Sequence, residues 1–231
     1  METLLTEPTL DLTPAQLQAL TQYADLLQTW NQKFNLTAIR TPEEIWTRHF
    51  LDSLTCLRVM RGTPLTRVID VGTGAGFPGL VLKIVHPEMH LTLVESVGKK
   101  VSFCEEVVRT LGLEHVELQT ARAEALGQSP AHREQYDWAI ARAVAPLPVL
   151  VEYLLPFVKV GGKMLAQKGI KTEEEVKQAE KAIPALGGKL EQIVPVARPG
   201  AEGHTLIVIA KPRPTPERYP RPVGVPAKRP L

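Results

Sequence analysis

The sequence predicts an α/β fold in which a doubly wound, mostly parallel sheet ends in an antiparallel hairpin and carries an N-terminal helical cap. From about residue 67 onward, short apolar runs typical of strands alternate with amphipathic helical segments. The last two apolar runs are joined by a connector too short for a crossover helix, so they are expected to pair as a hairpin. A chain of 231 residues with 44% hydrophobic residues is long enough to bury one substantial core.

Residues 1–62 are predicted to form the helical cap. Thr13 and Pro14 resemble a capping box with proline at the first helical position, and apolar residues then recur at spacings of three and four as far as Phe34. A second helix start of the same kind follows at Thr41. The cap is therefore expected to pack an apolar helical face on the main domain.

Residues 63–211 are predicted to form the main domain. Five parallel strands are expected at 67–72, 91–96, 116–121, 136–143 and 162–169, and helices near 78–86, 99–111 and 146–158. A further helix is followed by the segments EQIVPVA and HTLIVIAKP, which supply the hairpin. A seven-stranded sheet of this kind is the Rossmann-like arrangement of class I S-adenosylmethionine-dependent methyltransferases, an analogy at the level of the fold.

Residues 212–231 are predicted to form a basic, proline-rich arm. From Lys211 to the last residue, the sequence has seven prolines and six Lys or Arg against one acidic residue. Three interpretations stay open: a solvated tail, a contact with nucleic acid, and a segment that packs back on the domain through Tyr219.

Composition gives no indication of a membrane or metal protein. No apolar stretch reaches the length of a membrane span, and the first residues lack the basic and apolar regions of a signal peptide, so a cytoplasmic protein is expected. Cys56 and Cys104 have no neighbours at metal-ligand spacing, and both are predicted to be buried and inert.

The stretch RVIDVGTGAGFPGL, residues 67–80, places four glycines in eight positions directly after a predicted strand. Together with Glu95, it formally satisfies the fingerprint of dinucleotide-binding folds. Pro78, however, removes a backbone N–H that would hold phosphates, and Asp70 would bring a carboxylate close to them. S-adenosylmethionine has no phosphate, carries an ammonium group that Asp70 can attract, and has ribose hydroxyls that suit Glu95. The methyl donor is favoured, and an NAD-dependent oxidoreductase remains an alternative.

Seven motifs occur in order along the chain: NLTAIR (35–40), HFLDSL (49–54), DVGTGAGFPG (70–79), GKKVSF (98–103), RAE (122–124), ARAVAPL (141–147) and QKG (167–169). Over about residues 16–211, the chain resembles the ribosomal RNA small subunit methyltransferase G family. The resemblance implies methyl transfer from S-adenosylmethionine to N7 of a guanine in bacterial 16S rRNA, guanine 527 in the reference numbering. It implies 16S rRNA or a small-subunit precursor as partner, and a monomer is expected. A non-catalytic RNA-binding module on the same fold remains a second alternative.

The resemblance also implies a donor site. Its candidate residues are Gly72, Gly74, Gly76, Phe77, Glu95, Ala123, Glu124 and Arg142. No general base is expected, because N7 of guanine has a free lone pair and no proton to lose. No metal is expected either.

Cationic residues near the expected cleft are candidates for contact with RNA. They are Arg40, His49, Lys99, Lys100, Arg142 and Lys168. Lys99 and Lys100 open a predicted helix, where the helix dipole disfavours positive charge, so an anionic partner explains them more simply than helix stability does. For His49, next to an apolar residue on a helix, a buried structural role is equally compatible with the sequence.

Overall fold

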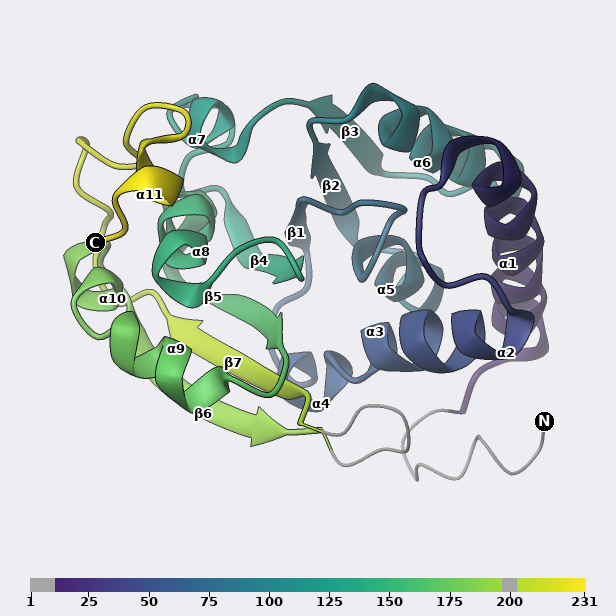
Figure 1. Cartoon of the computed structure of the whole chain (residues 1–231), viewed down its shortest axis with the longest axis horizontal. Coiled ribbons are helices and arrows are strands. Elements are labelled where there is room, and N and C mark those ends of the chain that lie inside the picture. The colour runs from purple at the N-terminus through teal and green to yellow at the C-terminus, as the bar shows by residue number, and fades with distance from the viewer. Residues whose placement is uncertain (1–10, 197–202) are drawn as a thin grey trace.

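The computed structural model describes residues 11–196 and 203–231. The first ten residues of the predicted cap, and residues 197–202 of the predicted hairpin and its connector, lie outside the described residues. Within the described part, seven strands form one sheet in the order β3-β2-β1-β4-β5-β7-β6 (Figure 1). The strands are β1 (Arg67–Val71), β2 (His90–Glu95), β3 (Val116–Thr120), β4 (Tyr136–Arg142), β5 (Val158–Lys168), β6 (Lys189–Pro195) and β7 (Thr205–Ala210).

The first five strands run parallel, and β7 is antiparallel to both β5 and β6. The predicted fold class, including the terminal antiparallel hairpin, is confirmed. Strand β5 begins four residues before its predicted start, because the chain pairs with β4 already at Val158 and is bent between there and Lys163. The carboxyl end of β5, at Lys168, is within one residue of the predicted end at residue 169.

Helices cover both faces of the sheet (Figure 1). One face packs against α1 (Pro14–Phe34), α5 (Gly79–Val85), α6 (Gly98–Leu111) and the short cap helices α2 (Pro42–Glu44), η2 (Ile45–Leu51), α3 (Asp52–Leu54) and α4 (Leu57–Met60). The other carries α7 (Ala123–Leu126), α8 (Leu147–Leu154), η3 (Leu155–Phe157), α9 (Thr172–Gln178), α10 (Ala182–Ala185) and α11 (Val225–Lys228). The sheet therefore separates two hydrophobic cores.

The cap is anchored to the main domain by helix α1. The helix begins with the predicted capping box at Thr13 and ends at Asn35, which is in the left-handed conformation with φ +48°. Its Tyr23 is fully buried, packs on Phe77 with ring centroids 5.3 Å apart, and donates a hydrogen bond to the carbonyl of Ala75. Helix α1 thus supports the glycine-rich loop from one side.

The second cap helix contains a π-helical stretch. Residues Ile45–Leu51 form π-helical turns between α2 and α3, where the sequence predicted an ordinary helix. Such turns are rare and are often found at functional sites. Here they carry His49, and Asp52 follows directly; both side chains are buried against the sheet.

The C-terminal segment is packed on the domain, as in the third interpretation of the sequence, and residues 212–231 do not form an arm that stands clear of it. Tyr219 is only 6% exposed. Arg133 donates hydrogen bonds to the carbonyls of Thr215 and Tyr219, and Arg221 pairs with the fully buried Glu152 at 2.6 Å. The described segment contains no strand, in agreement with its proline content, but it does contain a short helix, α11, and it packs on the domain through side chains and carbonyl groups.

Candidate functional site

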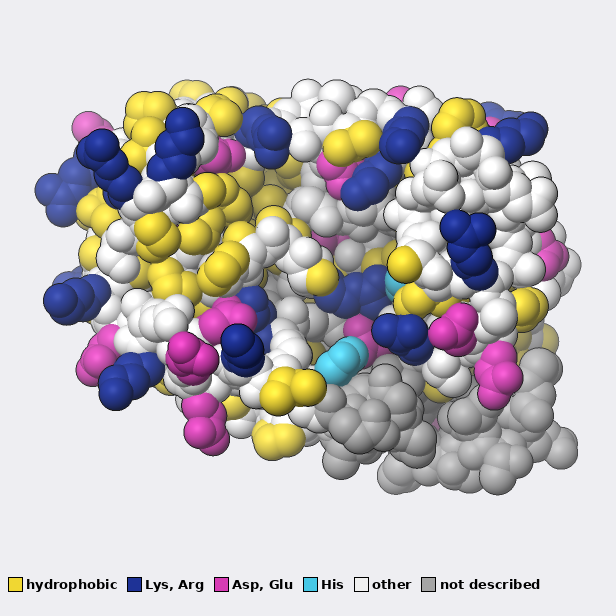
Figure 2. Space-filling model, viewed as in Figure 1, with side chains coloured by type: hydrophobic (Ala, Val, Ile, Leu, Met, Phe, Trp, Pro, Cys, Tyr) yellow, Lys and Arg dark blue, Asp and Glu magenta, His cyan; other side chains and the backbone are white. Residues whose placement is uncertain are grey.

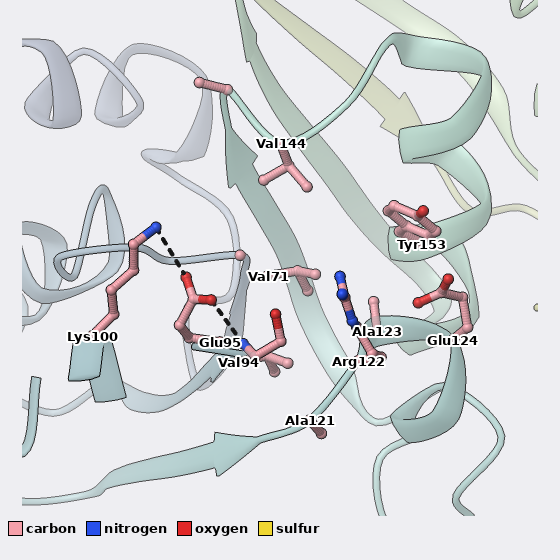
Figure 3. Close-up of a pocket in the computed structure, with 13 residues that line it drawn as sticks. Val71, Val94, Glu95, Lys100, Ala121, Arg122, Ala123, Glu124, Val144 and Tyr153 are labelled. Carbon is pink, nitrogen blue, oxygen red and sulfur yellow. Dashed lines mark hydrogen bonds and ion pairs between the residues drawn. The ribbon is translucent and has the colours of Figure 1, made fainter. Parts of the chain in front are cut away.

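A cavity of about 240 Å³ opens at the carboxyl ends of the parallel strands (Figure 3). Its walls are formed by residues at or just after the ends of β1, β2, β3 and β4, by the starts of α6 and α7, and by Tyr153 of α8. Glu95 and Lys100 lie on one side, and Val144 and Tyr153 lie on the other. This edge, where the strand order reverses between β1 and β4, is where open α/β sheets bind ligands.

Gly72 lines the cavity and is required there as glycine. Its φ is +70°, and a Cβ at this position would lie 2.7 Å from Cγ2 of Val144. The backbone is held in place because the Gly72 N–H donates to the Val94 carbonyl at 2.8 Å. A ligand can therefore approach the main chain at Gly72 more closely than any side chain would allow.

Glu95 is fixed by backbone groups at the end of β2. Oε1 accepts hydrogen bonds from Ser96 N–H at 2.7 Å and Val97 N–H at 2.9 Å, and Oε2 accepts one from Gly74 N–H at 3.1 Å. Lys100 Nζ lies 3.9 Å from Oε2. The carboxylate is thus preorganised at the cavity wall, and its remaining lone pairs can accept from hydroxyl groups of a ligand.

Ala123 and Glu124 are at the start of α7 and also line the cavity. Glu124 is buried, and its Oε1 accepts a hydrogen bond from the Gly224 N–H of the C-terminal segment at 2.9 Å. Arg122, Val144 and Tyr153 are among the lining residues that were not predicted as site residues. Arg122 lies in the RAE motif and Val144 in the ARAVAPL motif, so both could have been predicted. Tyr153 could not, because nothing in the sequence distinguishes it from the other residues of an apolar helix.

Four predicted donor residues, Gly74, Gly76, Phe77 and Arg142, do not line this cavity. Gly76 has φ +91°, and a Cβ there would collide with the Tyr23 hydroxyl and with Leu80, so this glycine is required by the packing of the cap. Gly74 contributes its N–H to Glu95, and Phe77 is buried beneath the loop. Gly74, Gly76 and Phe77 shape the loop from behind the cavity.

Asp70 has a different place from the one expected. It is fully buried under the loop, where Oδ2 accepts from the Thr73 hydroxyl at 2.7 Å and from Gly79 N–H at 2.8 Å. Burial raises the pKa of its carboxyl to about 6. Asp70 therefore holds the turn of the glycine-rich loop and does not itself line the cavity.

Arg142, at the end of β4, is directed toward the cap and does not line the cavity. Its NH1 donates to Asp52 Oδ2 at 3.0 Å and to the Arg48 carbonyl at 3.1 Å, and its NH2 donates to His49 Nδ1 at 2.9 Å. The guanidinium carbon lies 5.1 Å from the centre of the Phe77 ring. This one side chain ties the π-helical segment to the sheet.

Two more residues complete what we call the Asp52 cluster, made of His49, Asp52, Arg142, Gln167 and His204. Gln167 Nε2 donates to the Asp52 backbone carbonyl at 2.9 Å, and His204 Nδ1 lies 3.0 Å from Asp52 Oδ1. The members come from the cap and from the ends of β4, β5 and the loop before β7. The sequence indicated His49 and Arg142 but not the other three.

His49 is a neutral, buried side chain. The Arg142 guanidinium can only donate, so Nδ1 of His49 accepts, and Nε2 carries the proton facing the Thr37 hydroxyl at 3.1 Å. Its ring stacks on Phe77 with centroids 4.3 Å apart. Burial and the charge of Arg142 lower the pKa of His49 to about 3. His49 therefore does not offer a positive charge to RNA in this arrangement.

The neutral state of His49 predicts a pH effect on stability. The pKa in the folded state is below the ordinary value of 6.5, so below pH 6.5 the unfolded chain binds more protons and stability falls. Between pH 7 and pH 5 this costs about 2 kcal/mol. The variant His49→Gln keeps an acceptor and a donor but does not titrate, so we expect it to lose about 2 kcal/mol less than the parent over this interval. Urea denaturation at the two pH values measures the difference.

Asp70 opposes this effect, which is why the comparison with the variant is needed. Its raised pKa adds stability at low pH that is lost as the pH rises through about 6. Both the parent and His49→Gln contain Asp70, so subtracting the unfolding free energy of one from that of the other at each pH removes the Asp70 contribution. Identical profiles for parent and His49→Gln would contradict the assignment of a neutral His49.

The other predicted RNA contacts lie apart from the cluster or have internal partners. Lys99 Nζ donates to the Phe34 carbonyl at the end of α1, and Lys100 faces Glu95. Lys168 is nearly buried between the Ala145 carbonyl and Glu175, and Arg40, which is exposed, donates to the Asn35 side chain. These four cations therefore have partners within the described chain, namely backbone carbonyls, carboxylates and an amide oxygen, and their contact with RNA stays a prediction.

Basic side chains nevertheless gather on the face that carries the site. Figure 2 shows Lys, Arg and His side chains around a hollow in the middle of this face. Within the part of the chain that the structure describes, no helix is long and apolar enough to cross a membrane. No group of three or more potential metal ligands occurs among those residues either.

Comparisons with known proteins agree with this architecture. A family model for rRNA small subunit methyltransferase G matches residues 16–203. This chain belongs to that family. It is 53% identical over 96% of its length to ribosomal RNA small subunit methyltransferase G of Roseiflexus castenholzii, covering 94% of that protein. It is 50% identical over 94% of its length to the protein of the same name from Alkaliphilus metalliredigens, covering 91% of it.

Solved structures with low sequence identity share the fold of this family member. A SAM-dependent methyltransferase from Aquifex aeolicus aligns with a TM-score of 0.54 at 20% identity, covering 73% of this chain and 93% of that one. TrmN from Thermus thermophilus aligns with a TM-score of 0.54 at 20% identity, covering 69% of this chain and 48% of that one. These matches concern the arrangement of strands and helices.

Proposed function

We propose that this chain transfers a methyl group from S-adenosylmethionine to N7 of a guanine in bacterial 16S rRNA, guanine 527 in the reference numbering. Membership of the methyltransferase G family carries the proposal, and the position of the cavity supports it. An rRNA substrate, free or in a precursor of the small subunit, implies that the enzyme works in the cytoplasm. A monomeric state remains a prediction.

The residues around the cavity fit the donor. Glu95 provides fixed acceptors for the ribose hydroxyls, and Gly72 leaves room for the methionine part along the main chain. Val71, Val94 and Val144 provide apolar contacts for the adenine ring, and the backbone at Ala123 is available to read its edge. Arg142, Phe77, Gly74 and Gly76 support this site from behind, so their contribution to donor binding is proposed to be indirect.

A dinucleotide fits less well. The Gly74 N–H, which a pyrophosphate would require, donates to Glu95, and the carboxylate itself would repel phosphate. A thermal-shift comparison of S-adenosylmethionine with NAD separates these two classes of ligand. The second alternative, a non-catalytic module, would bind RNA without turnover, and membership of a methyltransferase family favours catalysis instead.

The chemistry requires positioning and the exclusion of water. When bound, S-adenosylmethionine supplies an electrophilic methyl group on a sulfonium centre. As the guanine N7 lone pair forms a bond to this methyl in line, the sulfur–methyl bond breaks, the neutral thioether S-adenosylhomocysteine leaves, and the positive charge passes to the base. No proton has to leave, so no side chain needs to act as a base. The chain contributes by holding both reactants at the carboxyl edge of the sheet in a restricted orientation.

One experiment tests the proposed reaction. Purified protein is incubated with S-adenosylmethionine and small ribosomal subunits from cells that lack the gene, and the rRNA is mapped by mass spectrometry. We expect one new 7-methylguanosine in 16S rRNA. No incorporation, or a methyl group on an exocyclic amine or a pyrimidine, would contradict the proposal.

The donor site predicts the effect of Glu95→Gln. The amide keeps the shape of the side chain but replaces one acceptor oxygen with a donor facing the N–H groups of the loop. We expect the dissociation constant for S-adenosylmethionine to rise about 10- to 100-fold, which corresponds to about 1.5–3 kcal/mol for hydrogen bonds to a charged group. Calorimetry measures it, and Glu105→Gln on the exposed face of α6 is the matched control. An unchanged constant would remove Glu95 from the donor site.

A further inference from the structure

Within the described residues, the Asp52 cluster contains a buried hydrogen-bond acceptor without a partner, Oε1 of Gln167. The direction of its amide group is fixed by Asp52, because Nε2 lies 2.9 Å from the Asp52 carbonyl and 3.4 Å from Oδ2, and both of these atoms can only accept. The oxygen must therefore face the other way. A buried polar atom of this kind in a folded protein calls for an explanation.

The cluster adjoins the cavity proposed for the donor. Arg142 is followed directly by Ala143, which lines that cavity, while the Arg142 side chain is directed into the cluster. Gln167 is the register partner of Arg142 on the neighbouring strand β5. The end of β4 thus separates the two sites, so a group held in the cluster would lie beside a methyl group held in the cavity.

Arg142 and Gln167 offer complementary polar atoms side by side. On the Arg142 guanidinium, NH1 donates twice and NH2 donates once, and no bond is found for Nε among the described residues. Register partners on neighbouring parallel strands lie about 4.8 Å apart at the backbone and project from the same face of the sheet, so the two side chains start side by side. This pattern matches the two ends of the Watson–Crick edge of guanine, where O6 accepts and the N2 amino group donates.

We propose that Gln167 is a specificity-determining residue for the acceptor base: its Oε1 accepts a hydrogen bond from the N2 amino group of the target guanine, while Arg142 donates to O6. This inference rests on the proposed function. Adenine has a donor at position 6 and nothing at position 2, so it would leave both protein groups unpaired. Holding the Watson–Crick edge leaves the N7 lone pair free for attack, and it requires a guanine that is unpaired in the RNA.

The role of Asp52 follows from the same contacts. Arg142 and His204 hold its carboxylate, and the carboxylate and carbonyl of Asp52 hold the Gln167 amide. Asp52 is therefore a positioning residue that prevents the amide from flipping. Oε1 is buried, so the groups that cover it must move when RNA binds. During this movement Asp52 keeps hold of the amide nitrogen, so that Oε1 stays directed away from Asp52 and toward the base.

Inosine provides the test, because it lacks only the N2 amino group of guanine. RNA substrates with guanine or inosine at the target position are methylated by the parent and by Gln167→Met, which keeps the size of the side chain without its acceptor. We expect the parent to favour guanine by about 10- to 100-fold in kcat/KM. In Gln167→Met we expect the guanine substrate to lose that factor, the inosine substrate to keep its rate, and donor affinity to stay unchanged.

Three results would overturn the role of Gln167. The first is an equal kcat/KM of the parent enzyme for the guanine and inosine substrates. A Gln167→Met enzyme that keeps the preference, or that loses activity equally on both substrates, would show that Gln167 has only a structural role. Gln178→Met, on the exposed part of α9, is the matched control and should behave like the parent. If the parent methylates neither substrate nor the small subunit, the proposed function itself fails.

Discussion

Replacing Arg142 with methionine is expected to lower the free energy of unfolding by about 3–5 kcal/mol and to abolish methyl transfer. The Arg142 side chain is 15% exposed and Asp52 is 4% exposed, so the variant leaves a buried carboxylate without its guanidinium partner. It also leaves the His49 Nδ1 and the Arg48 carbonyl without a donor. Urea denaturation measures the loss of stability, and incorporation of a labelled methyl group measures the loss of activity.

A double-mutant cycle tests the cause of that loss. If the uncompensated charge of Asp52 dominates, Asp52→Asn combined with Arg142→Met should be less destabilised than the sum of the two single variants. Additive effects would show that the Arg142–Asp52 pair does not couple the cap to the sheet. Arg109→Met, on the exposed surface of α6, is the matched control and should change stability by less than about 0.5 kcal/mol.

Replacing Arg221 with methionine is expected to destabilise the protein by a similar amount, about 3–5 kcal/mol. Glu152 is fully buried, and the Arg221 side chain makes three hydrogen bonds to it, from Nε at 2.9 Å and 3.1 Å and from NH2 at 2.6 Å, all of which the substitution removes; the backbone N–H of residue 221 still donates to Oε1. Without this partner, a carboxylate remains in the apolar core behind α8. Thermal and urea denaturation measure the effect.

The matched control for this prediction is Arg213→Met, because Arg213 is an exposed arginine of the same C-terminal segment. Removing all residues after Lys211 should be at least as destabilising as Arg221→Met, since it also removes Tyr219 and the Gly224 N–H that bonds Glu124. Unchanged melting temperatures for both variants would mean that the segment is a dispensable tail.

Local patterns in the sequence were sufficient for most of the fold. The alternation of strands and helices, the capping box at Thr13 and the short connector before β7 each follow from interactions between near neighbours in the chain, so they could be read directly. Gly72 and Glu95 were also predictable, because their positions depend on the ends of two strands. The positions of these residues around the cavity agree with that expectation, and their role in donor binding stays a prediction.

The Asp52 cluster and the packed C-terminal segment could not be predicted in this way. Asp52 meets Gln167 and His204 across 115 and 152 residues, and no local pattern relates such positions. For the C-terminal segment, packing through Tyr219 was one of three open interpretations, and a further signal was Glu152, a single acid in the apolar run LPVLVEYL, which requires a buried cation from elsewhere. The contact of Lys99 with the Phe34 carbonyl could not be predicted either, because it depends on how the cap folds back on α6, and contact of Lys99 and Lys100 with RNA stays a prediction.

The contacts of the C-terminal segment also determine the order in which the enzyme can be completed during synthesis. Glu124, on the cavity wall, accepts a hydrogen bond from the Gly224 N–H, 100 residues later in the chain. Glu152 is paired by Arg221, which is 69 residues later. A nascent chain that has reached Lys211 contains every strand of the sheet and the whole glycine-rich loop, yet it has a buried, unpaired carboxylate in α8. A premature stop before Arg221 is thus expected to produce a protein with a complete sheet but reduced stability, the kind of protein that is exposed to degradation.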